Sequence, residues 1–287
     1  MKNFGLIGFP LSHSFSPAYF ENKFKRENIN ANYKAYPIDD IDRYCELIEN
    51  VSFSGLNVTI PYKEKILPFL DEIDEVAKKI GAVNTIKFYK GRSKGYNTDV
   101  FGFEVSLIKL IGYPEIIKGA LVLGSGGASH AVCFILEKLN IPHQIVSRND
   151  KRYLRYDDIT EKICSDINLI INTTPLGMSP NEDKRPELPY HWLNENYFLY
   201  DLIYNPEKTI FLTEGLKRGC KIKNGHDMLI LQADKSWEIW NQPAKMSMTY
   251  NPKTIMVIIP INLNIDFWLS NASDIPSVLL TANAFLI

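Results

Sequence analysis

The sequence predicts an α/β protein of two domains, the first with a mainly parallel sheet and the second with a doubly wound, Rossmann-like sheet. Three observations support this prediction. Short apolar strand patterns alternate with helix patterns, which favours parallel strands joined by right-handed crossovers. A glycine-rich turn follows a buried strand pattern in the second region, which opens at about Val100, and doubly wound folds bind nucleotides at such a turn. The chain has 287 residues, close to the upper limit of a single hydrophobic core.

The first domain is expected over residues 1–100. Its first strand is the apolar segment Phe4–Gly8, and a helix is expected to begin at Ser16 and Pro17. Serine is a good N-cap, and proline is favoured at the first helical position. The other expected elements of this domain are strands over 32–36 and 55–60 and helices over 41–48 and 66–80.

The second domain is expected over residues 101–226. Its first strand is Ala120–Leu123, and the helix after it places Val132, Ile135, Leu136 and Leu139 on one face at helical spacing. Strands are also expected over 143–146, 168–172 and 198–203, and a further helix over 227–241. The tail over 243–287 contains the β-prone segment 254–259 but no motif, and we assign it no function.

Composition excludes several classes of function. The 32 Lys and Arg residues nearly balance 33 Asp and Glu residues, so nothing indicates binding to nucleic acid or to an anionic membrane surface. No apolar run approaches the ~18 residues of a membrane span, and Met1–Ile7 does not resemble a signal peptide. We therefore expect a cytoplasmic protein.

The cysteine and histidine residues do not indicate a metal site. The four Cys and five His residues are scattered, without the spacings that are typical of metal ligands. We expect no bound metal, and we expect reduced cysteines.

The glycine-rich turn predicts a dinucleotide site. Gly124 permits a tight turn, Gly126 allows a pyrophosphate to approach the backbone, and the following helix directs free N–H groups at that anion. The sixth position of the usual pattern is Ser129 rather than glycine. After the next strand, Arg148 and Arg152 favour NADP, because arginine pairs well with a 2′-phosphate.

Polar residues gather at the expected strand ends of the first hundred residues. Hydroxyl and amide groups in these places suit a polyhydroxylated small molecule. Each of them alone has an ordinary explanation as a cap, a turn residue or a surface charge. They are Ser14, Ser16, Asn57, Thr59, Lys63, Asn84, Thr85, Asn97 and Asp99.

Taken together, the motifs of residues 4–241 resemble the shikimate dehydrogenase family. They occur in the family's order along nearly the whole chain except the tail, which the family does not lead us to expect. The motifs are Gly8–Pro17 (GFPLSHSFSP), Asn57–Lys63 (NVTIPYK), Gly81–Thr85 (GAVNT), Asn97–Asp99 (NTD), Gly124–Ser129 (GSGGAS), Asn172–Met178 (NTTPLGM) and Met228–Gln232 (MLILQ).

The resemblance implies an oxidoreductase that reversibly reduces 3-dehydroshikimate to shikimate with NADPH, in the chorismate route to aromatic amino acids. It implies that residues 1–100 bind substrate together with the returning helix 227–241, and that residues 101–226 bind NADP. Lys63 and Asp99 would form the catalytic pair. The implied substrate-binding residues are Ser14, Ser16, Asn57, Thr59, Lys63, Asn84, Asp99, Tyr204 and Gln232. The implied cofactor-binding residues are Gly124, Ser125, Gly126, Gly127, Ala128, Ser147, Arg148, Arg152, Thr173, Gly225 and Met228.

Elementary chemistry agrees with the implied catalytic pair. Reduction of a ketone creates an alkoxide that must gain a proton, and a lysine ammonium can donate that proton and stabilise the charge. Asp99 would orient Lys63 and accept a substrate hydroxyl.

Several alternatives stay open at this stage. Asp150 follows the second strand of the cofactor domain, where relatives that use NAD and quinate carry an acidic residue, so a shikimate/quinate dehydrogenase is the main alternative. A non-catalytic ligand sensor would not need Lys63 and Asp99, and a methyltransferase would not explain the first hundred residues. The sequence leaves a monomer and a homodimer equally open.

Overall fold

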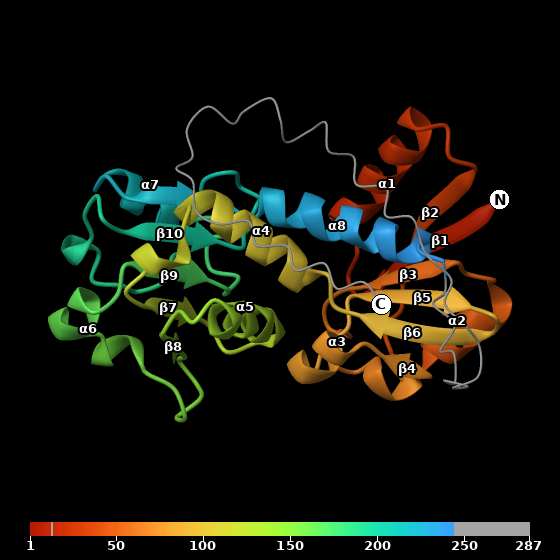
Figure 1. Cartoon of the computed structure of the whole chain (residues 1–287), viewed down its shortest axis with the longest axis horizontal. Helices are drawn as coiled ribbons and strands as arrows, with labels where there is room; N and C mark the ends of the chain where they lie inside the picture. Colours follow the sequence, from red (N-terminus) through yellow and green to blue (C-terminus); the bar gives the residue numbers. More distant parts are fainter. Residues whose placement is uncertain (13, 244–287) are drawn as a thin grey trace, which may run out of the picture. The chain divides into compact units, whose positions relative to one another are not determined.

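A computed structural model of the chain describes residues 1–12 and 14–243. Residues Met1–Ala244 form one compact unit that contains two sheets (Figure 1). The expected tail over 243–287 lies outside the described residues except for its first residue. The structure confirms the predicted α/β class. Among the described residues, no helix is both long enough and apolar enough to cross a membrane.

The first sheet has six strands in the order β2-β1-β3-β5-β6-β4. Strands β1, β2 and β3 pair in parallel, as do β4 and β6, whereas β5 pairs antiparallel with both β3 and β6. The sheet is therefore mainly parallel, as predicted. Its elements are β1 (Lys2–Gly8), α1 (Phe15–Arg26), β2 (Ala31–Pro37), α2 (Arg43–Asn50), β3 (Gly55–Val58), the 3₁₀ helix η1 (Leu67–Phe69), β4 (Glu72–Ile73), α3 (Glu75–Ile80), β5 (Thr85–Tyr89) and β6 (Arg92–Tyr96).

The second sheet has five strands in the order β11-β10-β9-β7-β8, all parallel. This order places the first strand, β7, between β8 and β9, so that the strand order reverses beside it, as in doubly wound folds. Its elements are α4 (Asp99–Ile111), η2 (Pro114–Ile116), β7 (Ala120–Leu123), α5 (Gly127–Lys138), β8 (His143–Val146), η3 (Tyr156–Asp158), α6 (Glu161–Ser165), β9 (Leu169–Asn172), η4 (Tyr190–Trp192), β10 (Phe198–Asp201), α7 (Ile210–Leu216), β11 (Lys221–Lys223) and α8 (His226–Asn241).

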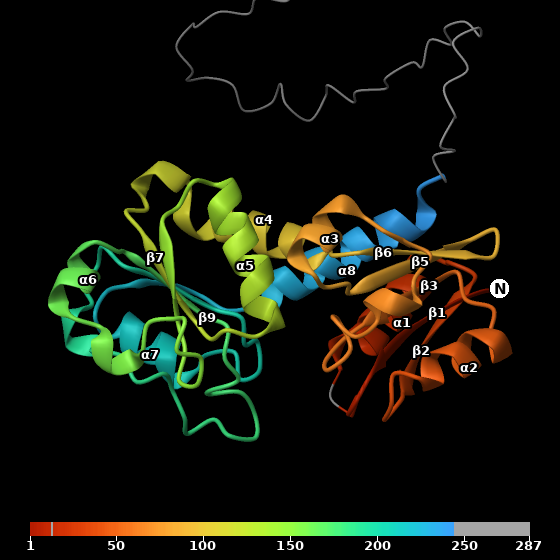
Figure 2. The same cartoon turned by 90° about the horizontal axis from the view of Figure 1, so that it is seen from below.

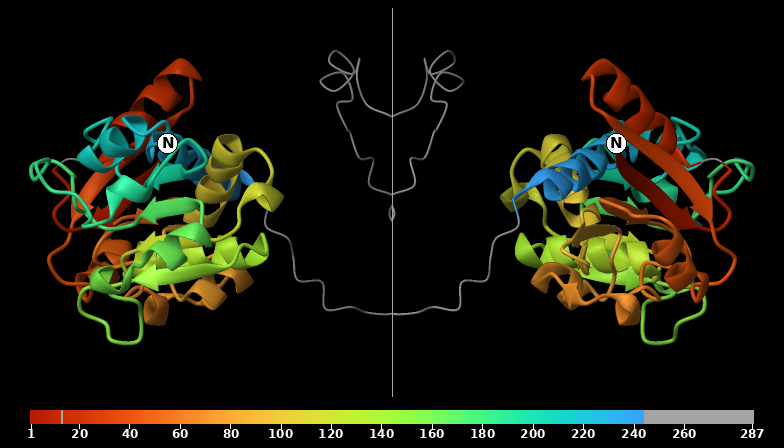
Figure 3. Two further views of the ribbon diagram at one scale, coloured as in Figure 1. Left: turned by 90° about the vertical axis from the view of Figure 1, so that its left-hand side faces the viewer. Right: turned by 90° about the vertical axis from the view of Figure 1, so that its right-hand side faces the viewer.

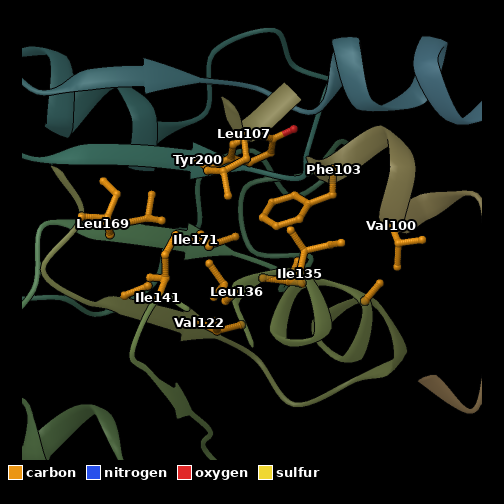
Figure 4. Packing of buried hydrophobic residues seen from close by; sticks show 14 of the residues in the cluster. Val100, Phe103, Leu107, Val122, Ile135, Leu136, Ile141, Leu169, Ile171 and Tyr200 are labelled. Carbon is orange, nitrogen blue, oxygen red and sulfur yellow. The ribbon is translucent and has the colours of Figure 1, made fainter. Parts of the chain in front are cut away.

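Alternate residues of β7 explain why this sheet is covered on both faces. Ala120 and Val122 join the core beneath α4 and α5, whereas Leu121 and Leu123 join the core on the opposite face. Figure 4 shows the first of these cores, in which Phe103 of α4 packs beside Tyr200 of β10. A strand that buries both faces reads as a continuous apolar run, which is how Ala120–Leu123 reads.

Helices α4 and α8 lie side by side, as Figures 2 and 3 show. Gly102 of α4 allows this approach, because a Cβ atom there would lie 2.5 Å from the Met228 carbonyl oxygen of α8. The far end of α8 packs Trp240 against Phe4 and Phe20 under the first sheet. Lys87 of β5 donates hydrogen bonds to the carbonyl oxygens of Ile239 and Gln242 and so caps the end of α8.

Two predictions for the first domain are wrong. The expected helix over 66–80 is instead divided into η1, β4 and α3. Pro68 has no N–H group with which to continue a helical hydrogen-bond ladder. Asp74 is the N-cap of α3, because its carboxylate accepts a hydrogen bond from the Val76 N–H. The expected N-cap, Ser16, lies two residues too late, because Ser14 holds the N-cap position and α1 begins at Phe15.

The sequence prediction also missed the hairpin formed by β5 and β6. Its turn residues Lys90 and Gly91 have φ values of 49° and 75°, and glycine adopts such values without strain. The hairpin makes β5 the antiparallel neighbour of β3. It thereby places Asn84, just before β5, beside the end of β3.

Candidate active site

A cavity of about 360 Å³ lies at the carboxyl ends of β1 and β3. It is lined by residues from the strand ends, from the first turn of α1 and from α8. Every substrate-side residue that the sequence predicts lies on its wall: Ser14, Ser16, Asn57, Thr59, Lys63, Asn84, Asp99, Tyr204 and Gln232.

Lys63 and Asp99 form an ion pair in this cavity, with 2.7 Å between Lys63 Nζ and Asp99 Oδ2. Asp99 is the first residue of α4, where the partial positive charge of the helix terminus stabilises a carboxylate. The Asn84 amide donates to the other carboxylate oxygen at 2.9 Å. The side chains of Lys63 and Asp99 keep 27% and 14% of their surface exposed, so solvent protons can reach the pair.

Behind this pair lies a buried network of amides and hydroxyls. Asn57 Nδ2 donates to the Asn84 carbonyl, to Thr85 Oγ1 and to Ser236 Oγ, each at 3.1 Å. Asn84 Nδ2 also reaches Gln232 Oε1 at 3.3 Å. Since buried polar groups are costly when they are unpaired, these mutual bonds fix the orientation of the side chains that line the cavity.

Tyr33 extends the network beneath the strands. It is buried and donates from its hydroxyl to Asn57 Oδ1 at 2.8 Å. Burial raises the pKa of Tyr33 well above its usual range, and a hydrogen bond with Ser16 opposes part of this rise. The neutral phenol therefore holds Asn57 in one orientation at all physiological pH values.

Part of the cavity wall is aromatic. The Tyr204 ring meets the Phe15 ring edge-on, with 6.3 Å between centroids, and burial raises the pKa of Tyr204. Ser14, Ser16 and Thr59 are half-buried here. Small hydroxyl groups and an aromatic pair therefore line the same cavity.

On the other sheet, the glycine-rich turn joins β7 to α5. Gly124 has a φ value of 109°, and a Cβ atom there would lie 2.7 Å from Thr173 Oγ1, so only glycine fits. Gly126 occupies the N-cap position of α5, where the described structure shows no side-chain cap, and the space around its Cα is open. The first N–H groups of α5 are thus available to an anion.

The side chains around this turn fix its shape. Ser125 Oγ lies 3.0 Å from Ser147 Oγ, and Thr173 Oγ1 donates to the Leu123 carbonyl at 2.7 Å. Gly127 and Ala128 form the first turn of α5. The turn is therefore linked to the chain segments that follow β8 and β9.

The predicted arginines after β8 lie apart from each other. Arg148 lines a cavity of about 520 Å³, whereas Arg152 lines a separate depression along the edge strand β8. The Arg152 guanidinium lies 2.6 Å from Asp150 Oδ2 and, with the Arg152 backbone N–H, lowers the pKa of Asp150 to about 2. Asp150 is therefore charged at physiological pH.

Gly225 and Met228 lie at the start of α8. Gly225 packs so closely on the Leu202 carbonyl that no side chain fits, and its N–H donates to the Ile203 carbonyl at 3.0 Å. Met228 packs against the core below α4. Neither residue lies on the wall of the 360 Å³ cavity.

With this geometry in place, comparison with known proteins identifies the family. Residues 6–86 match the model of the shikimate dehydrogenase substrate binding domain. A curated relative, shikimate dehydrogenase (NADP(+)) of Methanosphaera stadtmanae, is 37% identical over 256 residues, which cover 82% of this chain and 90% of the relative. The chain belongs to the shikimate dehydrogenase family.

Solved structures of the family share this fold. The shikimate 5-dehydrogenase of Thermus thermophilus, solved in complex with NADP(H) and shikimate, is 31% identical, with a TM-score of 0.74 over 84% of this chain and 94% of that chain. The quinate dehydrogenase of Corynebacterium glutamicum, solved in complex with NAD, is 26% identical, with a TM-score of 0.75 over 84% and 93% of the two chains. The predicted two-domain, Rossmann-like architecture of shikimate dehydrogenases is confirmed.

Sequence reasoning missed several residues that lie on the cavity wall. Met178, Ser179 and Asn205 come from the loops after β9 and β10, and Ser12 lies before α1. Met178 ends the NTTPLGM motif, so its position in that motif was the available signal. Ser179 and Asn205 each precede a proline and carry no pattern that separates them from ordinary loop residues.

Proposed function

We propose that the chain is a shikimate dehydrogenase that reversibly reduces 3-dehydroshikimate to shikimate with NADPH, in the route to chorismate and aromatic amino acids. One observation carries the proposal. The Lys63–Asp99 ion pair lies in a cavity whose wall consists of amides and hydroxyls that are already oriented by one another. Such a wall suits a small ring with several hydroxyl groups.

The roles of the lining residues follow from their chemistry. Ser14 and Ser16 are hydroxyl donors beside the N-terminus of α1, which suits the substrate carboxylate. Asn57, Thr59, Asn84, Asp99 and Gln232 exchange hydrogen bonds with the ring hydroxyls, and Tyr204 adds a contact on the substrate side. These groups bind and orient the ring. Because they are already ordered in the folded protein, binding loses little side-chain conformational entropy.

Lys63 acts as the general acid in reduction and as the base in oxidation. Its ammonium group donates a proton to the substrate oxygen as the ketone becomes an alcohol, and stabilises the negative charge on that oxygen. Asp99 holds the ammonium group through the 2.7 Å contact, and Asn84 holds Asp99. Because part of Lys63 stays exposed, the proton is replaced from solvent.

The cofactor is expected at the glycine-rich turn. Bound NADPH supplies the hydride. The turn fits a pyrophosphate, since Gly124 has no room for a side chain and the N-terminus of α5 is open. We assign Gly124, Ser125, Gly126, Gly127 and Ala128 to the pyrophosphate, Ser147, Arg148 and Arg152 to the adenosine end, and Thr173, Gly225 and Met228 to the nicotinamide end.

The same proposal includes the predicted domain division. Residues 1–100 with the returning helix 227–241 bind substrate, and residues 101–226 bind NADP, because the two sheets are built from β1–β6 and from β7–β11 respectively. A cytoplasmic location, and a monomer or a homodimer, stay predictions.

The second candidate is a shikimate/quinate dehydrogenase that accepts NAD as well as NADP. Asp150 favours it, because a carboxylate after β8 can accept hydrogen bonds from an adenosine ribose. In the structure, however, Asp150 is engaged by Arg152. This pairing with Arg152 leaves the Asp150 carboxylate less available to a ribose hydroxyl.

The test is the oxidation of shikimate and of quinate, each with NADP⁺ and with NAD⁺, followed by absorbance of the reduced cofactor. We expect turnover of shikimate with a strong preference for NADP⁺. Comparable kcat/KM values with NAD⁺ or with quinate would favour the second candidate. Absence of turnover with both polyols would overturn the proposed function.

A further inference from the structure

Two loops that leave the carboxyl ends of β9 and β10 contribute to the wall of the 360 Å³ cavity. The loop after β9 supplies Met178 and Ser179, and the loop after β10 supplies Tyr204 and Asn205. The two loops also meet directly, because the Ser179 N–H donates to the Asn205 carbonyl at 3.2 Å. The place of this part of the wall therefore depends on what fixes the two loops relative to each other.

Asp201, the last residue of β10, accepts hydrogen bonds from both loops. Its Oδ1 accepts from Asn172 Nδ2 and from the Ile203 N–H, each at 3.0 Å, and its Oδ2 accepts from the Thr209 hydroxyl at 2.6 Å. Asn172 ends β9, where the first loop begins, whereas Ile203 and Thr209 lie near the two ends of the second loop. One carboxylate thus joins the start of the first loop to both ends of the second.

Asn172 extends this constraint into the loop after β9. Its Oδ1 accepts from the Thr174 N–H at 3.0 Å and from the Thr174 hydroxyl at 2.6 Å, and Thr174 Oγ1 accepts in turn from the Leu176 N–H at 3.3 Å. The chain of hydrogen bonds from Asp201 therefore reaches to within two residues of Met178 on the cavity wall.

The surroundings of Asp201 are unfavourable for a charged group. Its side chain is fully buried, and within residues 1–12 and 14–243 the structure shows no cation paired with it. Burial raises the pKa of Asp201 to about 6, although its three hydrogen-bond donors oppose part of this rise. An apolar side chain here would avoid the loss of solvation. The stability of the sheet therefore does not explain the carboxylate, whereas the two loops that it joins do.

We propose that Asp201 is a positioning residue for the dehydrogenase reaction, which holds the loops after β9 and β10 so that Met178 and Tyr204 keep their places on the cavity wall. This inference rests on the proposed function for the identity of the substrate. Asp201 itself does not line the cavity, so it acts through the two loops and not through contact with the substrate ring.

The first residue of the loop after β9 is held in a different way. Both the N–H and the hydroxyl of Thr173 donate to the Leu123 carbonyl, at 2.9 and 2.7 Å. Thr173, which the proposed function assigns to the nicotinamide end, therefore stays in place when Asp201 is changed. Loss of Asp201 should thus affect the substrate far more than the cofactor.

Steady-state kinetics tests this difference. Asp201→Ala removes all three acceptor contacts and should raise KM for shikimate about tenfold and lower kcat, as for a misplaced binding wall, with KM for NADP⁺ changed less than threefold. Asp201→Asn keeps an oxygen for the Asn172 and Ile203 donors, and the Thr209 hydroxyl can rotate to accept from the amide. It should restore KM for shikimate to within threefold. Asp183→Ala, at an exposed position in the loop after β9, is the control and should change neither KM.

A double-mutant cycle with Tyr204 separates positioning from a general loss of stability. Tyr204→Phe should raise KM for shikimate in the original protein and have a much smaller effect in the Asp201→Ala background, because Tyr204 is then already displaced. Additive effects would overturn the inference, as would an unchanged KM for shikimate in Asp201→Ala. If Asp201→Ala does not fold, Thr209→Val replaces it in the cycle, because it removes one donor at nearly constant volume, and the same two outcomes decide.

Amide hydrogen exchange of the full chain without ligands, measured by mass spectrometry, tests the inference independently of turnover. Asp201→Ala should speed exchange about tenfold or more in peptides over 173–180 and 202–209, and leave peptides from the first sheet unchanged. A uniform increase in all peptides would overturn the inference. Absence of shikimate turnover in the original protein, with the effect on exchange retained, would instead overturn only the proposed function.

Discussion

The proposed substrate cavity and the proposed adenosine end of the cofactor site are built in opposite ways. The substrate side chains are buried and hydrogen-bonded to one another before any ligand arrives, as Asn57 is to Thr85 and Ser236. Around the adenosine end the cations are exposed, and Arg152 is paired with its own neighbour. The first arrangement favours fixed geometry for chemistry, whereas the second leaves specificity open to change by single surface substitutions.

The largest expected effect tests the fixed side. Lys63→Ala should lower kcat by at least about 10²-fold with a modest change in KM for shikimate, because it removes a proton donor that acts in the transition state. Steady-state kinetics measures this, with Lys65→Ala as the control for an exposed lysine on the same loop. A large rise in KM with kcat intact would make Lys63 a binding residue only.

The second sheet also holds a buried polar group that is hydrogen-bonded within the protein, at Asp201 of β10. Asp201 is fully buried, and burial raises its pKa from 3.8 to about 6, although Thr209, Ile203 and Asn172 donate to it. Folding therefore favours the protonated acid, and this contribution is lost as the pH rises from about 4 to 6. It amounts to about 3 kcal/mol.

The Asp201→Asn variant should lack that loss. Its free energy of unfolding, measured by urea titration, should gain about 3 kcal/mol relative to the original protein between pH 4 and pH 6. Asp183→Asn, at an exposed loop position, should follow the pH dependence of the original protein. Parallel pH curves for Asp201→Asn and the original protein would contradict the prediction.

A smaller effect is expected within the substrate network. Ser236→Ala removes a fully buried hydroxyl that accepts from Asn57 and donates to the Gln232 carbonyl, and should cost about 1–2 kcal/mol of stability. KM for shikimate should rise a few-fold while KM for NADP⁺ stays constant. Ser165→Ala, at an exposed site, serves as the control. An equal loss of stability and an equal rise in KM for shikimate in both variants would contradict the prediction.

The smallest effect is expected at the adenosine end. Asp150→Asn releases Arg152 and removes a negative charge near the phosphate subsite, so kcat/KM with NADP⁺ should rise a few-fold. The free energy of unfolding should hardly change, because the pair is at the surface. If Asp150 instead binds the ribose of NAD, KM for NAD⁺ would rise, which parallel assays with both cofactors detect.

The sequence predicted the parallel strands from local apolar patterns, whereas it predicted the residues of the cavity through motifs that resemble those of the family. Ala120–Leu123 is apolar throughout since both faces are buried, and the NVTIPYK and NTD motifs place Lys63 and Asp99 at chain positions next to a strand end and a helix start. The hairpin of β5 and β6 was missed because β6, Arg92–Tyr96 (RSKGY), is short and mostly polar and so carries a weak strand pattern. Likewise, the pairing of Asp150 with Arg152 depends on side-chain conformation, which residue order does not determine.

The close crossing of α4 and α8 has a consequence for the width of the substrate cavity. Asp99 starts α4, Gln232 lies on α8, and the Asn84 amide spans the gap between them, with 2.9 Å to one and 3.3 Å to the other. Gly102 sets this gap, because a Cβ atom there would lie 3.2 Å from Gln232 Cβ as well as pressing on the Met228 carbonyl. One absent methyl group thus lets the two helices approach closely enough for a single amide nitrogen to donate to side chains of both.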